Sequence, residues 1–462
     1  MIVRSIDAII RMLDADYIEN GDIEEKIHGV CIDSRKVEKG NLYIPIIGEN
    51  NNGHAYAAQA IEKGAKALLW QRNEPNPPKD VVIILVEDTT KALQQLAASY
   101  RLQLDMKVVG ITGSNGKTST KDILAAVLKQ HYRTQKTQGN FNNEIGVPLT
   151  LLSLNEDCEA AVVEMGMENL HELSFLTNMV KPDVAIISNV GTAHLENLGT
   201  MENIAKAKVE IVEGIKEHGS FIYNGDQELI RNAVIEKCIP GDIRKYTFGF
   251  HGDNDMQVHD ITQKREGIRF CVNDFESFTL DMIGKHQALN ATSAFMAASI
   301  LGVSDEEIRA GFMDIEKTGL RNELVDFDQC LILNDSYKSN PQSALAALDT
   351  MEEFDYDYKV CVLGDMLELG ETSDMIHYNL GKDLANYHLN EVLTTGEMAR
   401  YIAQGANNHL EGVLVRHFED KEALIDYLYP LHEKSAMLLI KGSRGMKLDE
   451  VVDALVKKVE GK

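Results

Sequence analysis

Short apolar runs alternate with helical patterns along most of this chain. The runs occupy residues 107–112, 160–165, 183–190, 330–335, 358–365 and 436–442. Strands that are buried on both faces of a parallel sheet are continuously apolar rather than alternating. Runs of this kind separated by helices predict an α/β protein, in which ligands bind beyond the carboxyl ends of the strands.

The length of 462 residues is too great for one ordinary hydrophobic core. A proline-rich segment at 73–80 is followed by one more apolar run at 81–86, which suggests a boundary near residue 87. Residues 257–282 show strand-like pieces without helices, and strand–helix alternation resumes after about residue 315. We therefore predict three units at 1–87, 88–315 and 316–462.

The composition narrows the environment and the partners. The formal net charge is −26, from 46 basic and 72 acidic residues, and such a field repels nucleic acid. No apolar run is long enough to cross a bilayer. The six cysteines are scattered without a CxxC pair, which favours reduced thiols and a cytoplasmic location.

The strongest chemical signal is a glycine-rich segment between the run at 107–112 and a helical pattern. It matches GxxGK[ST], a shorter form of the common phosphate-binding pattern. Backbone amides and a helix N-terminus there can face an anion, a lysine can reach the phosphates, and a hydroxyl can bind magnesium. ATPases, GTPase switches, kinases and ligases all use such a loop. The predicted loop comprises Gly113, Ser114, Asn115, Gly116, Lys117, Thr118 and Ser119.

Three further residues follow apolar runs on the expected ligand side. Glu164 lies at the end of the run at 160–165, where it is either a magnesium ligand or a solvated glutamate. His194 lies beyond the run at 183–190, as a hydrogen-bonding residue or a metal ligand. Lys208 falls in a helical stretch, and on pattern alone it pairs with glutamates on a solvated face.

Taken together, these segments resemble the Mur ligase family over essentially the whole chain. GITGSNGKTSTKD resembles the family's phosphate loop, EMGM its magnesium-binding glutamate, and SNVGTAHLENLG with IAKAKVEI its histidine and lysine. The resemblance implies a three-domain architecture with a central ATPase-like parallel-sheet domain and a Rossmann-like C-terminal domain. It also implies ATP and two magnesium ions as cofactors and a carbamylated Lys208. It assigns Lys117, His194 and Lys208 to catalysis and Thr118, Glu164, His194 and Lys208 to the metal.

Other segments resemble the branch of the family that adds D-alanyl-D-alanine to a UDP-linked tripeptide. These are KTQGNFNNEIGVPLTLL, NDSYKSNPQS, VLGDMLELGE and LIKGSRGMKLDE. The resemblance places the UDP-sugar substrate at Ser34, Arg35, Gly53, His54, Asn142 and Asn143, and the nucleotide also at Asn290, Arg321, Asp335, Tyr337 and Asn340. The chain departs from the family pattern at Asn52, where aspartate is usual, and at Gln287, where asparagine is common.

The resemblance implies a reaction in which ATP activates the terminal carboxylate of UDP-N-acetylmuramoyl-tripeptide as an acyl phosphate, which the amine of D-alanyl-D-alanine then attacks. It also implies that the protein works as a monomer whose first unit binds the UDP-sugar and whose last unit closes over ATP and binds the dipeptide. Two alternatives stay open: a related Mur-type or folylpolyglutamate amide ligase, and a nucleotide switch that hydrolyses ATP without ligation.

Overall fold

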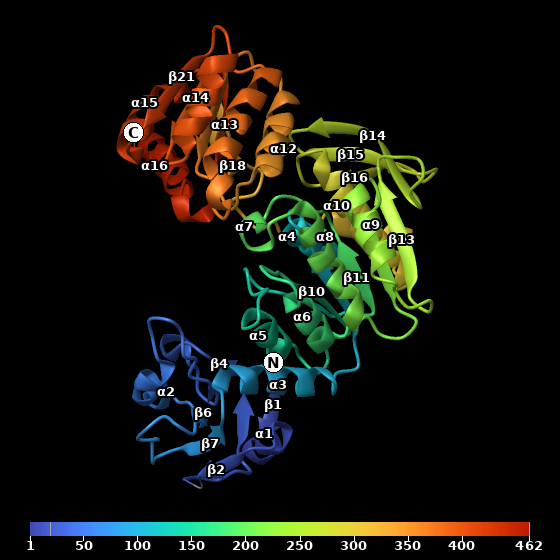
Figure 1. Cartoon of the computed structure of the whole chain (residues 1–462), viewed down its shortest axis with the longest axis vertical. Coiled ribbons are helices and arrows are strands. Elements are labelled where there is room, and N and C mark those ends of the chain that lie inside the picture. The colour runs from blue at the N-terminus through green and yellow to red at the C-terminus, as the bar shows by residue number, and fades with distance from the viewer. Residues whose placement is uncertain (19, 462) are drawn as a thin grey trace.

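A computed structural model describes residues 1–18 and 20–461 of the chain. Three α/β units follow one another along the longest axis, with the N-terminal unit at one end and the C-terminal unit at the other (Figure 1). In the described part of the chain, the three main sheets contain five, nine and six strands. None of the helices in these residues is long and apolar enough to span a membrane.

The N-terminal unit contains the five-stranded sheet, in the order β2-β7-β6-β5-β4. Its strands are parallel except β2, which pairs antiparallel with β7 at the sheet edge. A short antiparallel ribbon of β1 and β3 lies beside it. The elements are β1 (Val3–Ser5), α1 (Ile6–Leu13), β2 (Asp16–Ile18), β3 (Lys26–His28), β4 (Val30–Cys31), η1 (Ser34–Lys36), β5 (Leu42–Tyr43), η2 (Gly53–Tyr56), α2 (Ala57–Glu62), β6 (Ala67–Gln71) and β7 (Val82–Val86).

The central unit contains the nine-stranded sheet, in the order β16-β15-β14-β13-β12-β11-β8-β10-β9. The strands from β14 to β9 are parallel, whereas β14, β15 and β16 form an antiparallel extension. The strands are β8 (Lys107–Thr112), β9 (Thr134–Lys136), β10 (Ala160–Glu164), β11 (Val184–Ile187), β12 (Ser220–Asn224), β13 (Arg244–Gly249), β14 (Met256–Lys264), β15 (Gly267–Val272) and β16 (Phe278–Leu280).

The helices of the central unit cover both faces of this sheet, and the sheet separates two large apolar clusters. Helix α4 follows the central strand β8 and packs against α10 and α11, so almost all of its side chains are buried. The helices are α3 (Thr89–Arg101), α4 (Lys117–Lys129), α5 (Gly146–Ser153), α6 (Glu172–Val180), α7 (Leu195–Leu198), α8 (Met201–Val209), η3 (Glu210–Gly214), α9 (Glu228–Glu236), α10 (His286–Ile300) and α11 (Asp305–Phe312).

The C-terminal unit has a six-stranded sheet in the order β17-β18-β22-β19-β20-β21, parallel except for β17. Apolar clusters cover its two faces. The elements are β17 (Glu323–Phe327), β18 (Cys330–Asp335), α12 (Pro341–Glu352), β19 (Lys359–Gly364), η4 (Gly370–Thr372), α13 (Ser373–Asp383), η5 (Leu384–Asn386), β20 (Glu391–Thr395), α14 (Ala399–His409), β21 (Leu414–Phe418), α15 (Lys421–Leu428), η6 (Tyr429–Glu433), β22 (Ala436–Lys441), η7 (Arg444–Met446) and α16 (Asp449–Glu460).

The predicted α/β class and three-domain architecture are confirmed, and the predicted strands lie where the apolar runs placed them. The runs at 107–112 and 330–335 coincide with β8 and β18, and the others differ from β10, β11, β19 and β22 only at their ends. The largest difference is at residues 188–190, which belong to the predicted run but follow the end of β11. They turn out of the sheet because Ser188 and Asn189 hydrogen bond to the loop after β8 instead.

Candidate active site

The glycine-rich loop after β8 can adopt its path only with glycine at two positions. Gly113 has φ +153°, and a β-carbon there would lie 1.9 Å from Ser188 Oγ. Gly116 has φ +79°, and its β-carbon would lie 2.5 Å from Asn290 Oδ1. Side chains at either position would therefore meet both backbone strain and a clash.

The loop is held against the end of the neighbouring strand β11. The backbone N–H of Asn115 donates to Asn189 Oδ1 at 2.7 Å, and the Ser188 hydroxyl donates to the Asn115 carbonyl at 2.5 Å. The Ser114 N–H donates to the Asn189 carbonyl at 3.0 Å. These bonds hold the loop open, so that it can receive an anion at the N-terminus of α4.

Lys117 is the first residue of α4, and its ammonium group donates to the Gly113 carbonyl at 2.6 Å. Burial, together with the charges of Lys338 and Arg321, lowers its pKa to about 8 against the opposing effect of Glu164. A cation held among other cations favours an anionic ligand, because that ligand restores the charged form of the lysine.

One cavity of about 960 Å³ opens at this loop and is lined by both the central and the C-terminal units. Most of the predicted nucleotide, metal and central-unit substrate residues line it. They are Ser114, Asn115, Gly116, Lys117, Thr118, Ser119, Asn142, Asn143, Glu164, His194, Asn290, Arg321, Asp335 and Tyr337. The lining leaves out Gly113, Lys208 and Asn340.

The Glu164 carboxylate lies at the cavity wall and is 2% exposed. Its Oε2 accepts a hydrogen bond from Thr118 Oγ1 at 2.9 Å, and its Oε1 accepts one from Asn142 Nδ2 at 2.9 Å. A carboxylate beside a hydroxyl at a phosphate loop is a set of hard oxygen ligands that fits magnesium. Asn143 instead holds the turn that leads into α5, because its Oδ1 accepts the Gly146 N–H at 2.9 Å.

Lys208 is 2% exposed, and its ammonium group makes no hydrogen bond or ion pair with any residue that the structure describes. The interpretation of Lys208 as a solvated residue paired with glutamates is therefore wrong, because α8 turns this side chain inward. Burial, with the charges of Lys117 and Lys338, lowers its pKa well below the ordinary lysine value. The amine is consequently neutral far more readily than an exposed lysine.

His194 also faces the cavity and has φ +65°, at the N-terminus of α7. Its Nδ1 lies 3.5 Å from Glu368 Oε2 of the C-terminal unit. Burial and the charges of Lys338, Lys208 and Lys117 lower its pKa to about 3. The imidazole is therefore neutral at physiological pH, as a metal ligand must be.

The C-terminal unit contributes a stacked cation and a buried ion pair. The Arg321 guanidinium lies over the Tyr337 ring at 4.1 Å from its centroid, and its Nε is buried without a hydrogen-bond partner among the described residues. Asp335 Oδ2 accepts a hydrogen bond from Lys441 Nζ at 2.5 Å, and its Oδ1 accepts the Asn322 N–H at 3.3 Å. These bonds orient the end of β18 toward the cavity.

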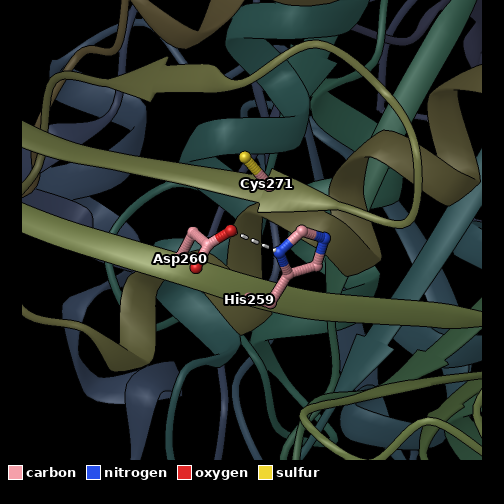
Figure 2. A group of neighbouring side chains, drawn as sticks. All are labelled: His259, Asp260 and Cys271. Atoms are coloured by element: carbon pink, nitrogen blue, oxygen red, sulfur yellow. Dashed lines mark hydrogen bonds and ion pairs between the residues drawn. The ribbon is translucent and has the colours of Figure 1, made fainter.

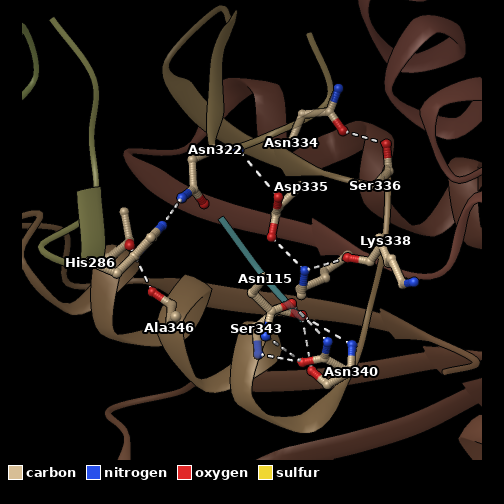
Figure 3. Close-up of polar contacts among 12 residues, drawn as sticks. Asn115, His286, Asn322, Asn334, Asp335, Ser336, Lys338, Asn340, Ser343 and Ala346 are labelled. Carbon is tan, nitrogen blue, oxygen red and sulfur yellow. Dashed lines mark hydrogen bonds and ion pairs between the residues drawn. The ribbon is translucent and has the colours of Figure 1, made fainter. Parts of the chain in front are cut away.

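Asn340 ties the two units together at the phosphate loop (Figure 3). Its Nδ2 donates to Asn115 Oδ1 at 2.8 Å, and Asn115 Nδ2 donates back to its Oδ1 at 3.4 Å. The same Oδ1 caps α12 by accepting the Ser343 N–H at 2.9 Å. Two amides 225 positions apart thus join the N-terminus of α12 to the loop.

The two departures from the family pattern preserve local hydrogen bonds. Gln287 Oε1 accepts from Asn290 Nδ2 at 2.8 Å and so orients the amide that lies against Gly116. Asn52 Oδ1 accepts the His54 N–H at 3.0 Å and lies 2.8 Å from His54 Nδ1. At both positions an amide oxygen accepts the local hydrogen bond, as the usual aspartate could at position 52 and the usual asparagine could at position 287.

The predicted N-terminal substrate residues lie away from the cavity, whose lining among the described residues begins at Ser114. Arg35 is exposed and pairs with Asp33 at 2.9 Å, an interaction that lowers the pKa of Asp33 to about 2. The Ser34 hydroxyl donates to Gln59 Oε1 at 2.6 Å. A β-carbon on Gly53 would lie 2.7 Å from the Ile46 nitrogen.

His54 is buried and fixed by three contacts. Its ring packs edge-on against Trp70 with centroids 4.7 Å apart, its Nε2 accepts the Gln71 N–H at 3.2 Å, and Asn52 meets its Nδ1. The ring is neutral, because its Nε2 accepts a hydrogen bond, and burial lowers its pKa. His54 therefore orders the surface around Gly53, whereas Arg35 alone among the four predicted residues is an exposed cation.

Sequence reasoning missed several residues that line the cavity, among them Lys338, Glu368 and Arg444. Lys338 lies inside NDSYKSNPQS and Glu368 inside VLGDMLELGE. Both segments were recognised in the sequence, but no role was assigned to these two residues. Glu368 has φ +66° and Oε2 within 3.5 Å of both Lys338 and His194. Only the folded structure, in which the C-terminal unit lies against the central unit, shows that Lys338, Glu368 and His194 share a site.

A second cluster of possible metal ligands lies outside the cavity, on the β14–β15 hairpin (Figure 2). Strand pairing sets Cys271 opposite His259, and a register shift after His259 brings in Asp260 with φ +49°. Both ring nitrogens have acceptors: Asp260 Oδ2 lies 2.9 Å from Nδ1 and the Asn273 carbonyl 2.8 Å from Nε2. These two acceptors raise the pKa of His259, and its protonated form does not bind metal.

Comparisons with known proteins agree with this site. Residues 26–101, 111–298 and 320–444 match the Mur ligase family catalytic domain, the Mur ligase middle domain and the Mur ligase glutamate ligase domain. The chain is 41% identical over 459 residues to the UDP-N-acetylmuramoyl-tripeptide–D-alanyl-D-alanine ligase of Bacillus subtilis, covering 99% of both chains. The Escherichia coli ligase of the same name is 33% identical, over 95% of this chain and 96% of that protein.

Solved structures show the same likeness over the full length. MurF from Acinetobacter baumannii superposes with a TM-score of 0.90 at 29% identity, covering 99% of both chains. The MurF ligase from Thermotoga maritima, solved in complex with ADP, gives a TM-score of 0.81 at 27% identity, covering 94% of this chain and 98% of that one. The identity to these ligases and the match of three successive domains show that the chain belongs to the Mur ligase family.

Proposed function

We propose that the protein is an ATP-dependent ligase that joins D-alanyl-D-alanine to UDP-N-acetylmuramoyl-tripeptide, giving the UDP-linked pentapeptide for peptidoglycan synthesis. The observation that carries this proposal is the cavity in which a phosphate loop and the C-terminal unit meet. The full-length likeness to ligases of this name selects the substrates.

The reaction has two chemical steps. A carboxylate oxygen of the tripeptide attacks the γ-phosphorus of ATP, and the bond from that phosphorus to the bridging oxygen breaks, which releases ADP and leaves an acyl phosphate. The amine nitrogen of D-alanyl-D-alanine then attacks the acyl carbon, loses a proton and displaces inorganic phosphate. Both steps depend on positioning and on stabilisation of phosphate charge more than on acid–base catalysis.

The residues around the phosphate loop provide this stabilisation. Lys117 and the amides of the loop face the phosphates, and Arg321 stacked on Tyr337 presents a cation from the other unit. We assign Asn290, whose amide lies against Gly116, to the adenine end of the nucleotide. Asp335 and Asn340 position the C-terminal wall of the site by their bonds to Lys441 and Asn115.

Residues that fit magnesium surround the same loop. The Thr118 hydroxyl and the Glu164 carboxylate offer oxygen ligands, and the neutral His194 offers nitrogen. We assign two magnesium ions to this set together with a modified Lys208. Bound magnesium would neutralise charge on the phosphate oxygens.

A buried amine without a partner explains how Lys208 can become a ligand. Its neutral nitrogen attacks carbon dioxide, the N–C bond forms and a proton leaves, giving a carbamate whose oxygens can bind metal. The test is NMR of the protein in ¹³C-bicarbonate with magnesium. A carbamate signal that is absent from Lys208→Met supports the modification, and equal spectra contradict it.

We assign residues 1–87 to binding of the UDP-sugar, 88–315 to ATP, and 316–462 to closure over ATP and binding of the dipeptide. Ser34, Arg35, Gly53 and His54 of the first unit, with Asn142 and Asn143 at the cavity, form the proposed substrate path. A monomer suffices, because one chain supplies every described wall of the cavity. All six cysteines are free thiols, which supports a cytoplasmic location.

The test of the proposed function is phosphate release from ATP with each substrate alone and with both together, followed by mass spectrometry of the UDP product. We expect release that requires both substrates and yields a UDP-pentapeptide. The variant Lys117→Ala should abolish it and serves as the control for contaminating ATPases. Release without either substrate and no new peptide would instead support a nucleotide switch.

A further inference from the structure

Lys338 is a cavity residue with no assigned role. It lies in the five-residue loop between β18 and α12, three residues after Asp335 and two before Asn340. Its backbone carbonyl accepts a hydrogen bond from the buried Lys441 Nζ at 2.9 Å. The backbone is thus fixed at both sides of Lys338, while its side chain remains 40% exposed at the cavity.

The ammonium group of Lys338 lies close enough to three groups of the central unit to affect each of them. Its charge lowers the pKa of Lys117, of His194 and of Lys208. Lys117 belongs to the phosphate loop, and His194 lines the same cavity and shares Glu368 with Lys338. Lys338 therefore faces the end of the cavity at which the phosphoryl group would be transferred, rather than the adenine end.

In this structure the charge of Lys338 is balanced by one carboxylate. Glu368 Oε2 lies 3.5 Å from Lys338 Nζ and 3.5 Å from His194 Nδ1. Both members of the pair are half-exposed, so the ion pair is weak and exchangeable. Arg321 and Lys117 line the same cavity, so cations from two units converge there in a chain of net charge −26.

We propose that Lys338 is a second phosphate-binding lysine. When ATP binds, its ammonium group breaks the ion pair with Glu368 and contacts the γ-phosphate oxygens, and later the phosphate of the acyl intermediate. This inference rests on the proposed function for the identity of the reaction, but its binding step requires only ATP. Lys117 approaches the phosphates from the central unit and Lys338 from the C-terminal unit. Contact with the γ-phosphate thereby favours the closed arrangement of the two units.

The experiment measures binding of ADP and of a non-hydrolysable ATP analogue to the full chain, in magnesium and without peptide substrates. For Lys338→Met we expect the Kd of the analogue to rise about tenfold to a hundredfold, because a charge-assisted hydrogen bond is lost. The Kd of ADP should change less than about twofold. Lys338→Arg should retain most of the preference for the analogue.

The matched control is Lys447→Met, which removes another C-terminal lysine that is exposed and lies outside the cavity lining. It should leave both Kd values unchanged, and thermal unfolding should show all variants folded. An equal loss of ADP and analogue affinity in Lys338→Met would indicate a purely structural role and overturn the inference. An unchanged analogue Kd would overturn it as well. Neither readout needs ligation, so failure of the proposed function would be seen separately.

Discussion

At the scale of single residues, the burial of Lys208 destabilises the fold but suits the residue to its proposed role as a carbamylated metal ligand. A buried ammonium without a counter-ion destabilises the fold, because desolvation is not offset. In buffer depleted of carbon dioxide, we expect Lys208→Met to raise the free energy of unfolding at pH 7 by about 1–2 kcal/mol. The same variant should lose ligase activity. Denaturant unfolding and phosphate release measure the two effects.

The pH dependence has a definite sign. The folded pKa of Lys208 lies below that of the unfolded chain, so the unfolded state binds more protons and stability rises with pH. The advantage of Lys208→Met should therefore shrink as the pH approaches the ordinary value of 10.5. Lys206→Met on the same helix removes an exposed lysine paired with Glu236 and should change stability little. A destabilised Lys208→Met would contradict the assignment.

Gly116 tests the phosphate loop at the same scale. In Gly116→Ala the β-carbon would meet Asn290 Oδ1 and hold a left-handed backbone, a strain of about 1–3 kcal/mol. We expect the KM for ATP to rise about tenfold or more, because each 1.4 kcal/mol is a factor of about ten. Gly241→Ala, whose β-carbon meets nothing within 4 Å, is the control. If both variants bind ATP like the parent chain, the loop geometry described here is not the binding geometry.

At the scale of elements, the N-terminus of α12 serves both stability and function. Asn340→Ala removes the cap of α12, at a cost of about 1 kcal/mol, and also the contact with Asn115. Ser304→Ala removes the equivalent cap of α11, which lies outside the cavity lining. We expect similar losses of stability but a fall in kcat/KM for Asn340→Ala alone. Equal kinetics of the two variants would show that the Asn115 contact has no part in the reaction.

Elements were also the level at which sequence predicted most. The runs that became β8 and β18 could be recognised because central parallel strands are apolar on both faces. The hairpin at β14–β15 was predicted only as strand-like pieces, and its bulge at His259 depends on cross-strand packing. The helical pattern alone did not predict the inward turn of Lys208, because IAKAKVEI fits a solvated helix as well as a buried one, and only the family resemblance implied a role at the site.

At the scale of the whole molecule, the site depends on contacts between units that cannot be predicted from the amino-acid sequence alone. In the pairs Asn115–Asn340 and His194–Glu368, residues more than a hundred positions apart join the central unit to the C-terminal unit. Sequence could supply their members by motif resemblance, as for Asn340, but it could not show that Glu368 and Lys338 would meet His194. Closure between units therefore has to be tested as a property of the folded chain.

Gly191 provides that test, because it lies where the two units touch. A β-carbon on Gly191 would lie 1.9 Å from Gln342 Oε1 of α12 and 3.4 Å from Ser114 Cβ. Alanine could be accommodated by rotation of the flexible Gln342 side chain, but the larger side chain of Gly191→Leu has to displace α12 itself. We expect kcat to fall about a hundredfold, since a misplacement of about 1 Å has effects of that size.

The affinity of Gly191→Leu for ADP should fall much less than kcat, because the phosphate loop belongs to the central unit alone. Small-angle scattering with the ATP analogue should give a larger radius of gyration than the parent chain, since the C-terminal unit would be held away. Gly241→Leu, which projects into open space, should behave like the parent chain in all three measurements. A normal kcat in Gly191→Leu would mean that the reaction does not require the arrangement of α12 against the phosphate loop.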